Sequence, residues 1–105
     1  MNNITFRVLV VDDHPLYRDG LVGLLGTTED LVVVGQAADG IEAVRLASEC
    51  SPDVVVMDVT MPELDGIEAT RRIRASTSLD KQPHIVGLTA NAMQGDREIC
   101  LAAGM

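Results

Sequence analysis

Four short apolar runs recur along the chain, at residues 6–11, 31–37, 53–57 and 84–90. They are rich in β-branched residues, and none alternates cleanly between apolar and polar positions. Strands of a parallel sheet have this pattern, because helices cover both of its faces. The runs therefore predict four parallel strands.

Helical periods fill the intervals between these runs. Apolar side chains recur at helical spacing in four stretches: Tyr17, Leu21 and Leu25; Ala43, Ala47 and Cys50; Ala69 and Ile73; and, more weakly, residues 92–103. The alternation of strand and helix predicts an α/β fold, a doubly wound parallel sheet with helices on both faces.

The pentapeptide DGIEA occurs twice, beginning at Asp39 and at Asp65. In each copy a Glu, Glu42 or Glu68, follows three residues after the Asp and directly precedes a helical period. This spacing is that of a capping box, in which the first residue bonds to the backbone of the first helical turn. The repeat predicts two helix starts and not a duplicated domain.

The composition limits the chain to one domain, residues 1–105, with an aliphatic core, since there is one Tyr, one Phe and no Trp. Sixteen acidic residues against eight basic ones give a formal net charge of −8, which argues against nucleic-acid binding through this domain. No segment resembles a signal peptide or a membrane span. We expect a soluble, cytoplasmic protein without a membrane partner, in which Cys50 and Cys100 are reduced.

Acidic residues stand where two of the predicted strands end. Asp12 and Asp13 directly follow the first run, and Asp58 follows the third. Helix capping before Pro15 explains one aspartate and leaves the second without a role. In a flavodoxin-like sheet, of strand order 2-1-3-4, ligands bind where strands one and three end, so we expect the three carboxylates to converge. Asp53 starts its strand and is expected at the opposite end.

Three carboxylates in one crevice need a cation or protons at neutral pH, and oxygen ligands of this kind suit Mg²⁺. A carboxylate beside Mg²⁺ is able to attack phosphorus, and Asp58 is the expected nucleophile because it stands alone at its strand end. Thr89 and Ala90 end the fourth run and would add a hydroxyl and a small side chain beside the crevice. His14 is interpreted as a surface histidine at a helix entry, with an acid–base or second-metal role as the alternative.

Three segments together resemble the receiver domain of two-component response regulators. They are VLVVDDHP at residues 8–15, VVVMDVTMPELDGIEATRRIR at 54–74 and IVGLTANA at 85–92. The resemblance runs in order along essentially the whole chain. It implies a signalling domain that accepts a phosphoryl group from a histidine kinase or a phosphotransfer protein and switches an output.

The resemblance also implies a role for each site residue. Asp58 would be the phospho-acceptor, Thr89 would engage the phosphoryl group in the active state, and Ala90 would keep that group accessible. The implied Mg²⁺ ligands are Asp12, Asp13, Asp58 and the backbone carbonyl of Thr60.

The motifs do not all resemble the same subfamily of receivers. DDHPLYRDGL, residues 12–21, is similar to receivers of helix-turn-helix transcription factors, whereas MDVTMPELDGIEATRRIR and TANAMQGDRE resemble receivers attached to hybrid sensor kinases.

A receiver also has a fifth strand ending in Lys-Pro and a fifth helix, and the one lysine here, Lys81, lies in a polar stretch before the fourth run. We therefore expect a receiver in which the fifth strand and helix are missing, and which is either less stable than a complete receiver or self-associated through the edge of strand four.

Three alternatives to a phospho-acceptor need different residues. A phosphatase of the haloacid dehalogenase type has a second Asp two residues after its nucleophile, where this chain has Thr60. A nucleotide-binding module needs a glycine-rich turn after the first strand, and DDHPLYRDG is not one. A receiver fold that binds partners without phosphorylation stays open, because the fifth-strand lysine is missing. The sequence thus favours a phospho-acceptor domain over an enzyme.

Overall fold

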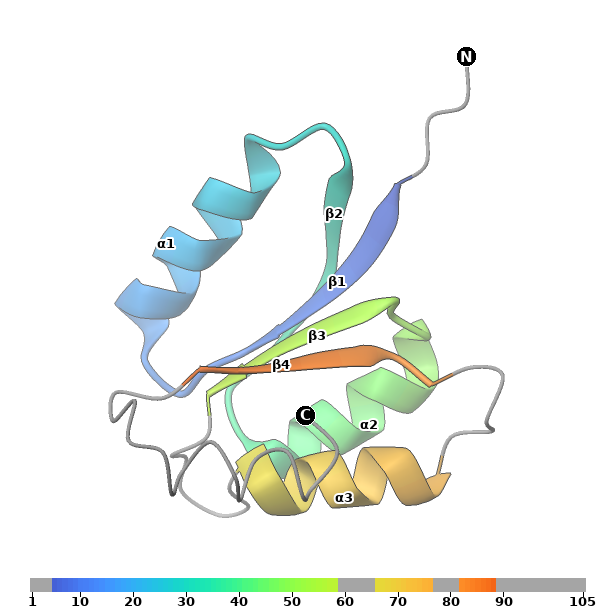
Figure 1. The fold of residues 1–105 in the computed structure, drawn as a ribbon. Coiled ribbons are helices and arrows are strands. Elements are labelled where there is room, and N and C mark those ends of the chain that lie inside the picture. Colours follow the sequence, from blue (N-terminus) through green and yellow to red (C-terminus); the bar gives the residue numbers. More distant parts are fainter. Residues whose placement is uncertain (1–4, 59–65, 77–81, 89–105) are drawn as a thin grey trace.

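The computed structural model describes residues 5–58, 66–76 and 82–88. Within these ranges four strands alternate with three helices: β1 (Phe6–Val11), α1 (Pro15–Gly26), β2 (Leu31–Ala37), α2 (Gly40–Cys50), β3 (Val54–Asp58), α3 (Gly66–Ser76) and β4 (His84–Leu88). The strands pair in parallel in the order β2-β1-β3-β4. Helix α1 lies on one face of the sheet, and α2 and α3 lie on the other (Figure 1). The predicted α/β fold and strand order are confirmed.

The element bounds follow the sequence pattern closely. Strand β3 begins one residue later than the run at 53–57 and includes Asp58. Thr89 and Ala90, at the end of the fourth run, and the weak helical period at 92–103 lie outside the described residues. None of the described helices is long and apolar enough to cross a membrane.

The core lies between the sheet and the helices α2 and α3. It consists of aliphatic side chains and one methionine: Leu9, Val11, Ala37, Ala43, Val55, Met57, Ala69, Ile73 and Ile85. In β1 every residue from Val8 to Val11 is buried, as expected of a central strand that is covered on both faces. An aliphatic core is therefore present, as the composition predicted.

Helix α1 is only partly buried against the rest of the protein. The apolar residues Tyr17, Leu21 and Leu25 do mark a helix, but no residue of α1 is fully buried. Tyr17 is 55% exposed, whereas Leu21 and Leu25 are partly covered against the sheet. The spacing thus identified the helix correctly, and the structure adds that its apolar side is only partly covered.

The ends of α2 are fixed by side chains. The Asp39 carboxylate accepts a hydrogen bond of 2.8 Å from the backbone N–H of Glu42, which confirms the helix start predicted from the first DGIEA copy. Asp65, which begins the second copy, lies outside the described residues. At the other end Ser51 adopts the left-handed conformation, with φ 48°, and Arg7 donates to the Cys50 carbonyl at 2.6 Å.

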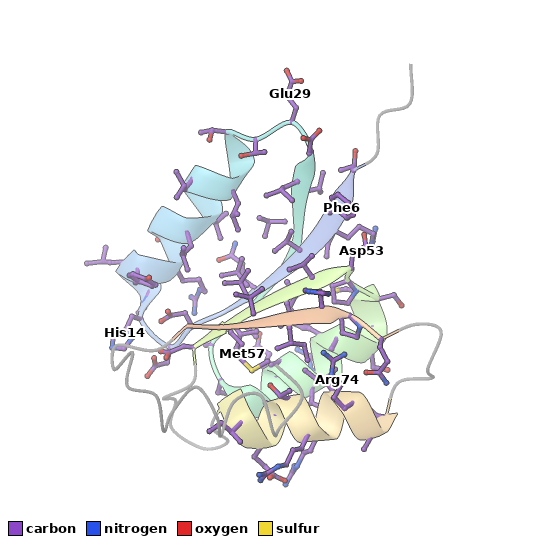
Figure 2. All side chains as sticks on the ribbon, in the orientation of Figure 1. Phe6, His14, Glu29, Asp53, Met57 and Arg74 are labelled. Carbon is purple, nitrogen blue, oxygen red and sulfur yellow. The ribbon has the colours of Figure 1, made fainter. Side chains whose placement is uncertain are left out.

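Asp53 lies at the end of the sheet opposite His14 (Figure 2). Its carboxylate accepts a bond of 2.8 Å from the backbone N–H of Arg7, and its backbone N–H donates to the Arg7 carbonyl at the same distance. The residue joins the starts of β1 and β3. Asp53 therefore stands apart from the carboxylates that follow β1 and end β3, as the sequence predicted.

Candidate metal centre

Strands β1 and β3 are neighbours, and their carboxyl ends are in register. Val11 pairs with Met57, so the residues that follow, Asp12 and Asp58, lie at the same edge of the sheet. One ligand atom from each of four residues lies within 4.8 Å of all the others, and the four are Asp12, Asp13, His14 and Asp58. The structure thus brings together the three carboxylates that the sequence placed at one crevice, and it adds a histidine.

Asp12 is the buried member of this group, with a side chain only 3% exposed. Its backbone N–H donates to the Ala37 carbonyl of β2 at 3.0 Å, which extends the ladder beyond the end of β1. Its carboxylate oxygen Oδ1 accepts from the backbone N–H of His14 at 2.8 Å and lies 3.2 Å from the ring atom Nδ1 of that residue. Asp12 therefore supplies the local turn that leads into α1.

Asp13 has a different environment. Its side chain is 24% exposed, yet its Oδ1 atom is buried and accepts no hydrogen bond within the described part of the chain. The Nδ1 atom of His14 lies 2.9 Å away, close enough for an ion pair when the ring is protonated, but it is not directed as a hydrogen bond. A buried carboxylate oxygen without a donor is costly, and a bound cation would offset that cost.

This difference answers the question that the two adjacent aspartates raised. Neither aspartate caps α1, whose N-cap is His14 without a side-chain capping bond; Asp12 instead accepts from the backbone N–H of His14, whereas Asp13 makes no hydrogen bond to the backbone of α1. The three carboxylates of this group, one of which has a buried oxygen without a donor among the described residues, are the oxygen ligands that a hard divalent cation such as Mg²⁺ prefers. The residues that are present therefore fit a metal centre.

His14 occupies the N-cap position of α1, directly before Pro15 at the first helical position. Its side chain is 71% exposed and makes no capping hydrogen bond. The hydrogen bond that the ring donates to the Asp12 carboxylate, followed by the negative charge of Asp13, raises the pKa of the imidazole above its ordinary value. The ring is thus a surface histidine at a helix entry whose protonated form partly offsets the charge of the carboxylates.

Asp58 ends β3 and is half-buried. The residue before it, Met57, is fully buried and lies 3.9 Å from the hydroxyl oxygen of Thr70 on α3. Strand and helix packing therefore fixes the base from which the Asp58 carboxylate extends. Of the remaining residues that the sequence placed at the site, Thr60, Thr89 and Ala90 lie outside the described residues.

One residue near the site was not singled out from the sequence. Arg18, in the first turns of α1, donates from Nη1 to the carbonyl oxygen of Asp12 at 2.8 Å. Its backbone N–H bonds to the carbonyl of His14, four residues earlier. The sequence signal that could have indicated Arg18 is its helical spacing from His14, because a residue four positions after the N-cap returns to the same side of the helix.

Comparison with known proteins identifies the family. The family model for the response regulator receiver domain matches residues 8–105. The chain therefore belongs to the response regulator receiver domain family, as the motifs of its first, third and fourth strands predicted.

Individual relatives agree with this assignment. The transcriptional regulatory protein LiaR of Bacillus subtilis is 49% identical over 84 residues, which cover 80% of this chain and 38% of LiaR. The chain thus spans well under half the length of that relative.

Two solved structures have the same fold. A LuxR-family response regulator from Aurantimonas sp. SI85-9A1 matches with a TM-score of 0.87 and 41% identity, covering 95% of this chain and 69% of the other. The receiver domain of the sensor histidine kinase PA1611 from Pseudomonas aeruginosa PAO1 matches with a TM-score of 0.82 and 44% identity, covering 96% and 80%. The PA1611 structure has a magnesium ion coordinated in its active site cleft.

Proposed function

We propose that this chain accepts a phosphoryl group on Asp58 in a Mg²⁺-dependent reaction and thereby switches an output. The observation that carries the proposal is the convergence of Asp12, Asp13 and Asp58 at one edge of the sheet, where no described residue donates a hydrogen bond to the buried Oδ1 of Asp13. Membership of the receiver family supports the same function.

Asp12, Asp13 and Asp58 would hold the metal ion, together with the backbone carbonyl of Thr60. When bound, Mg²⁺ supplies positive charge that neutralises the oxygens of the incoming phosphoryl group. The similar receiver of PA1611, which has magnesium in its active site cleft, supports this assignment.

In the reaction a carboxylate oxygen of Asp58 attacks phosphorus. The new O–P bond forms as the N–P bond of a donor phosphohistidine breaks, and the departing imidazole takes a proton from solvent. The Thr89 hydroxyl would then bind a phosphoryl oxygen, and Ala90 would leave room for the group. Thr60 stands where a haloacid dehalogenase phosphatase has a second Asp, so the acyl phosphate is expected to persist as a signal.

The phosphoryl donor in this proposal is a histidine kinase or phosphotransfer protein, and the receiver acts in the cytoplasm. The domain has no other catalytic activity and does not itself bind nucleic acid. Its relatives include both a transcriptional regulator and the receiver of a sensor kinase, so either type of output agrees with them. Self-association through the edge of β4 stays a prediction.

Phosphorylation by a small phosphodonor tests the function. Incubation with acetyl phosphate and MgCl₂ is expected to add the mass of one phosphoryl group to the parent in intact-mass spectra and none to Asp58→Asn. Asp53→Asn is the matched control, because Asp53 starts the same strand at the other end of the sheet and Asn keeps the acceptor for Arg7. Equal labelling of Asp58→Asn, or labelling unaffected by EDTA, would show that the assignment is wrong, and a parent that is not labelled at all would favour phosphorylation-independent binding.

A further inference from the structure

Arg18 is a half-buried arginine beside the carboxylates, and its environment is unusual. Nη1 donates to the Asp12 carbonyl at 2.8 Å, while Nε is buried and has no hydrogen-bond partner within the described part of the chain. An unpaired buried N–H costs free energy. A methionine would cover the same apolar surface without this cost, so stability alone does not explain the arginine.

The positive charge of Arg18 is also unfavourable for a cation site. A guanidinium close to bound Mg²⁺ repels it, since the two charges have the same sign. The residue therefore carries two costs, an unpaired N–H and a charge of the wrong sign. The hydrogen bond to the Asp12 carbonyl is the feature of Arg18 that could compensate for both.

That carbonyl belongs to the peptide group that joins Asp12 to Asp13. The N–H of Asp12 donates to Ala37 and holds the strand side of the residue, while its carboxylate accepts from the backbone N–H of His14 and closes the turn across Asp13. The bond from Arg18 is the one made by the carbonyl of the Asp12–Asp13 peptide itself, so it acts directly on the plane that leads to Asp13. The direction of the Asp13 side chain depends on this plane, because two backbone dihedrals per residue set the course of the chain.

We infer that Arg18 is a positioning residue for the divalent cation, which fixes the Asp12–Asp13 peptide so that Asp13 Oδ1 points into the site. The inference rests on the proposed function, because it requires a Mg²⁺ site at these carboxylates. It adds a residue of α1 to a site that is otherwise built from the ends of β1 and β3. Groups that orient metal ligands from outside typically change metal affinity about 10- to 100-fold when they are removed.

The test is the Mg²⁺ affinity of Arg18→Met, measured by isothermal titration calorimetry at fixed ionic strength. Loss of positive charge alone would tighten binding, whereas loss of positioning weakens it, so the two effects differ in sign. We expect affinity to fall about tenfold or more. Arg18→Lys keeps the charge without the guanidinium fork and is expected to lie between the parent and Arg18→Met. Arg45→Met, which removes an exposed arginine of α2, is the control and is expected to leave affinity unchanged.

A second readout does not depend on the metal. In the metal-free protein the backbone amide resonance of Asp13 is expected to shift in Arg18→Met and to stay in place in Arg45→Met. Unchanged or tighter Mg²⁺ binding by Arg18→Met, in a parent that binds Mg²⁺, would overturn this inference and leave the proposed function standing. A parent that does not bind Mg²⁺ would overturn the proposed function and this inference with it.

Discussion

Replacement of Asp13 by Asn is expected to have opposite effects on the metal-free and the Mg²⁺-bound protein. Without metal, Asp13 lies in a group whose ligand atoms are within 4.8 Å of one another, and its buried Oδ1 has no donor among residues 5–58, 66–76 and 82–88. An amide removes one negative charge with little change of shape. The metal-free variant should therefore be more stable than the parent, and the variant with Mg²⁺ should be less stable.

The size of the effect follows from the geometry. Two unit charges separated by the 4.8 Å limit of this group repel by about 3.5 kcal/mol at an effective dielectric constant of about 20 and by about 0.9 kcal/mol in bulk water. The lower value applies more closely here, because Asp13 is partly exposed and a protonated His14 offsets some of the charge. We expect the unfolding free energy of metal-free Asp13→Asn to rise by about 1 kcal/mol.

Magnesium should reverse this order. A ligand that binds only the folded state stabilises it by about 2.7 kcal/mol at a concentration 100 times its Kd. The parent should gain this amount, whereas the variant, with one ligand lost, should gain little. The two unfolding free energies therefore cross as Mg²⁺ is added.

Urea unfolding followed by far-UV circular dichroism measures both states, in EDTA and in MgCl₂ at matched ionic strength. Glu29→Gln is the control for net charge, because Glu29 is exposed and lies at the other end of α1 from His14 (Figure 2). If metal-free Asp13→Asn unfolds at lower urea than this control, Asp13 has a structural role. Equal stabilisation of parent and variant by Mg²⁺ would show that Asp13 is not a ligand.

Three further predictions concern stability, each measured by urea unfolding in EDTA. Asp39→Ala removes the carboxylate that caps α2 and should cost about 1 kcal/mol, whereas Ser48→Ala on the same helix should change little. Ser51→Gly should add about 0.5–1 kcal/mol, because glycine adopts the left-handed conformation without strain. Thr70→Val should be nearly neutral, since the hydroxyl bonds only within the α3 backbone and near Met57, but Thr70→Ser should cost about 1 kcal/mol for the lost buried methyl group.

Each of these predictions has a contrary result. An Asp39→Ala variant as stable as Ser48→Ala would mean that the cap contributes nothing. A loss of stability in Ser51→Gly would mean that the serine side chain stabilises the end of α2. If Thr70→Val is less stable than Thr70→Ser, the buried hydroxyl matters more than the methyl group.

The strand pattern predicted the fold well because burial on both faces leaves a direct mark on the sequence. The run from Val8 to Val11 is apolar without alternation, and all four residues are buried. The Asp39 cap was equally predictable from the sequence, since a bond between residues three positions apart depends only on local geometry. The depth to which α1 is buried was not predictable, because it depends on the elements that pack against the helix and not on its own period.

In the candidate site, too, some features could be predicted from the sequence and others could not. The convergence of Asp12 and Asp58 follows from strand order and register, which the pattern of runs predicts. The contact of Arg18 with the Asp12 carbonyl does not follow from the strand order, because a long side chain on a helix has many conformations and the sequence does not select among them. The unbonded oxygen of Asp13 was likewise visible only in the structure, since Asp12 and Asp13 are the same residue type at adjacent positions.

Borohydride trapping identifies the residue that carries the phosphoryl group, which we propose to be Asp58. Sodium borohydride reduces an aspartyl phosphate to homoserine, which peptide sequencing by mass spectrometry locates. After treatment with acetyl phosphate and MgCl₂, we expect homoserine at position 58 in the parent and aspartate at positions 12, 13 and 53. Homoserine at any of those other positions, or at none, would contradict this proposal.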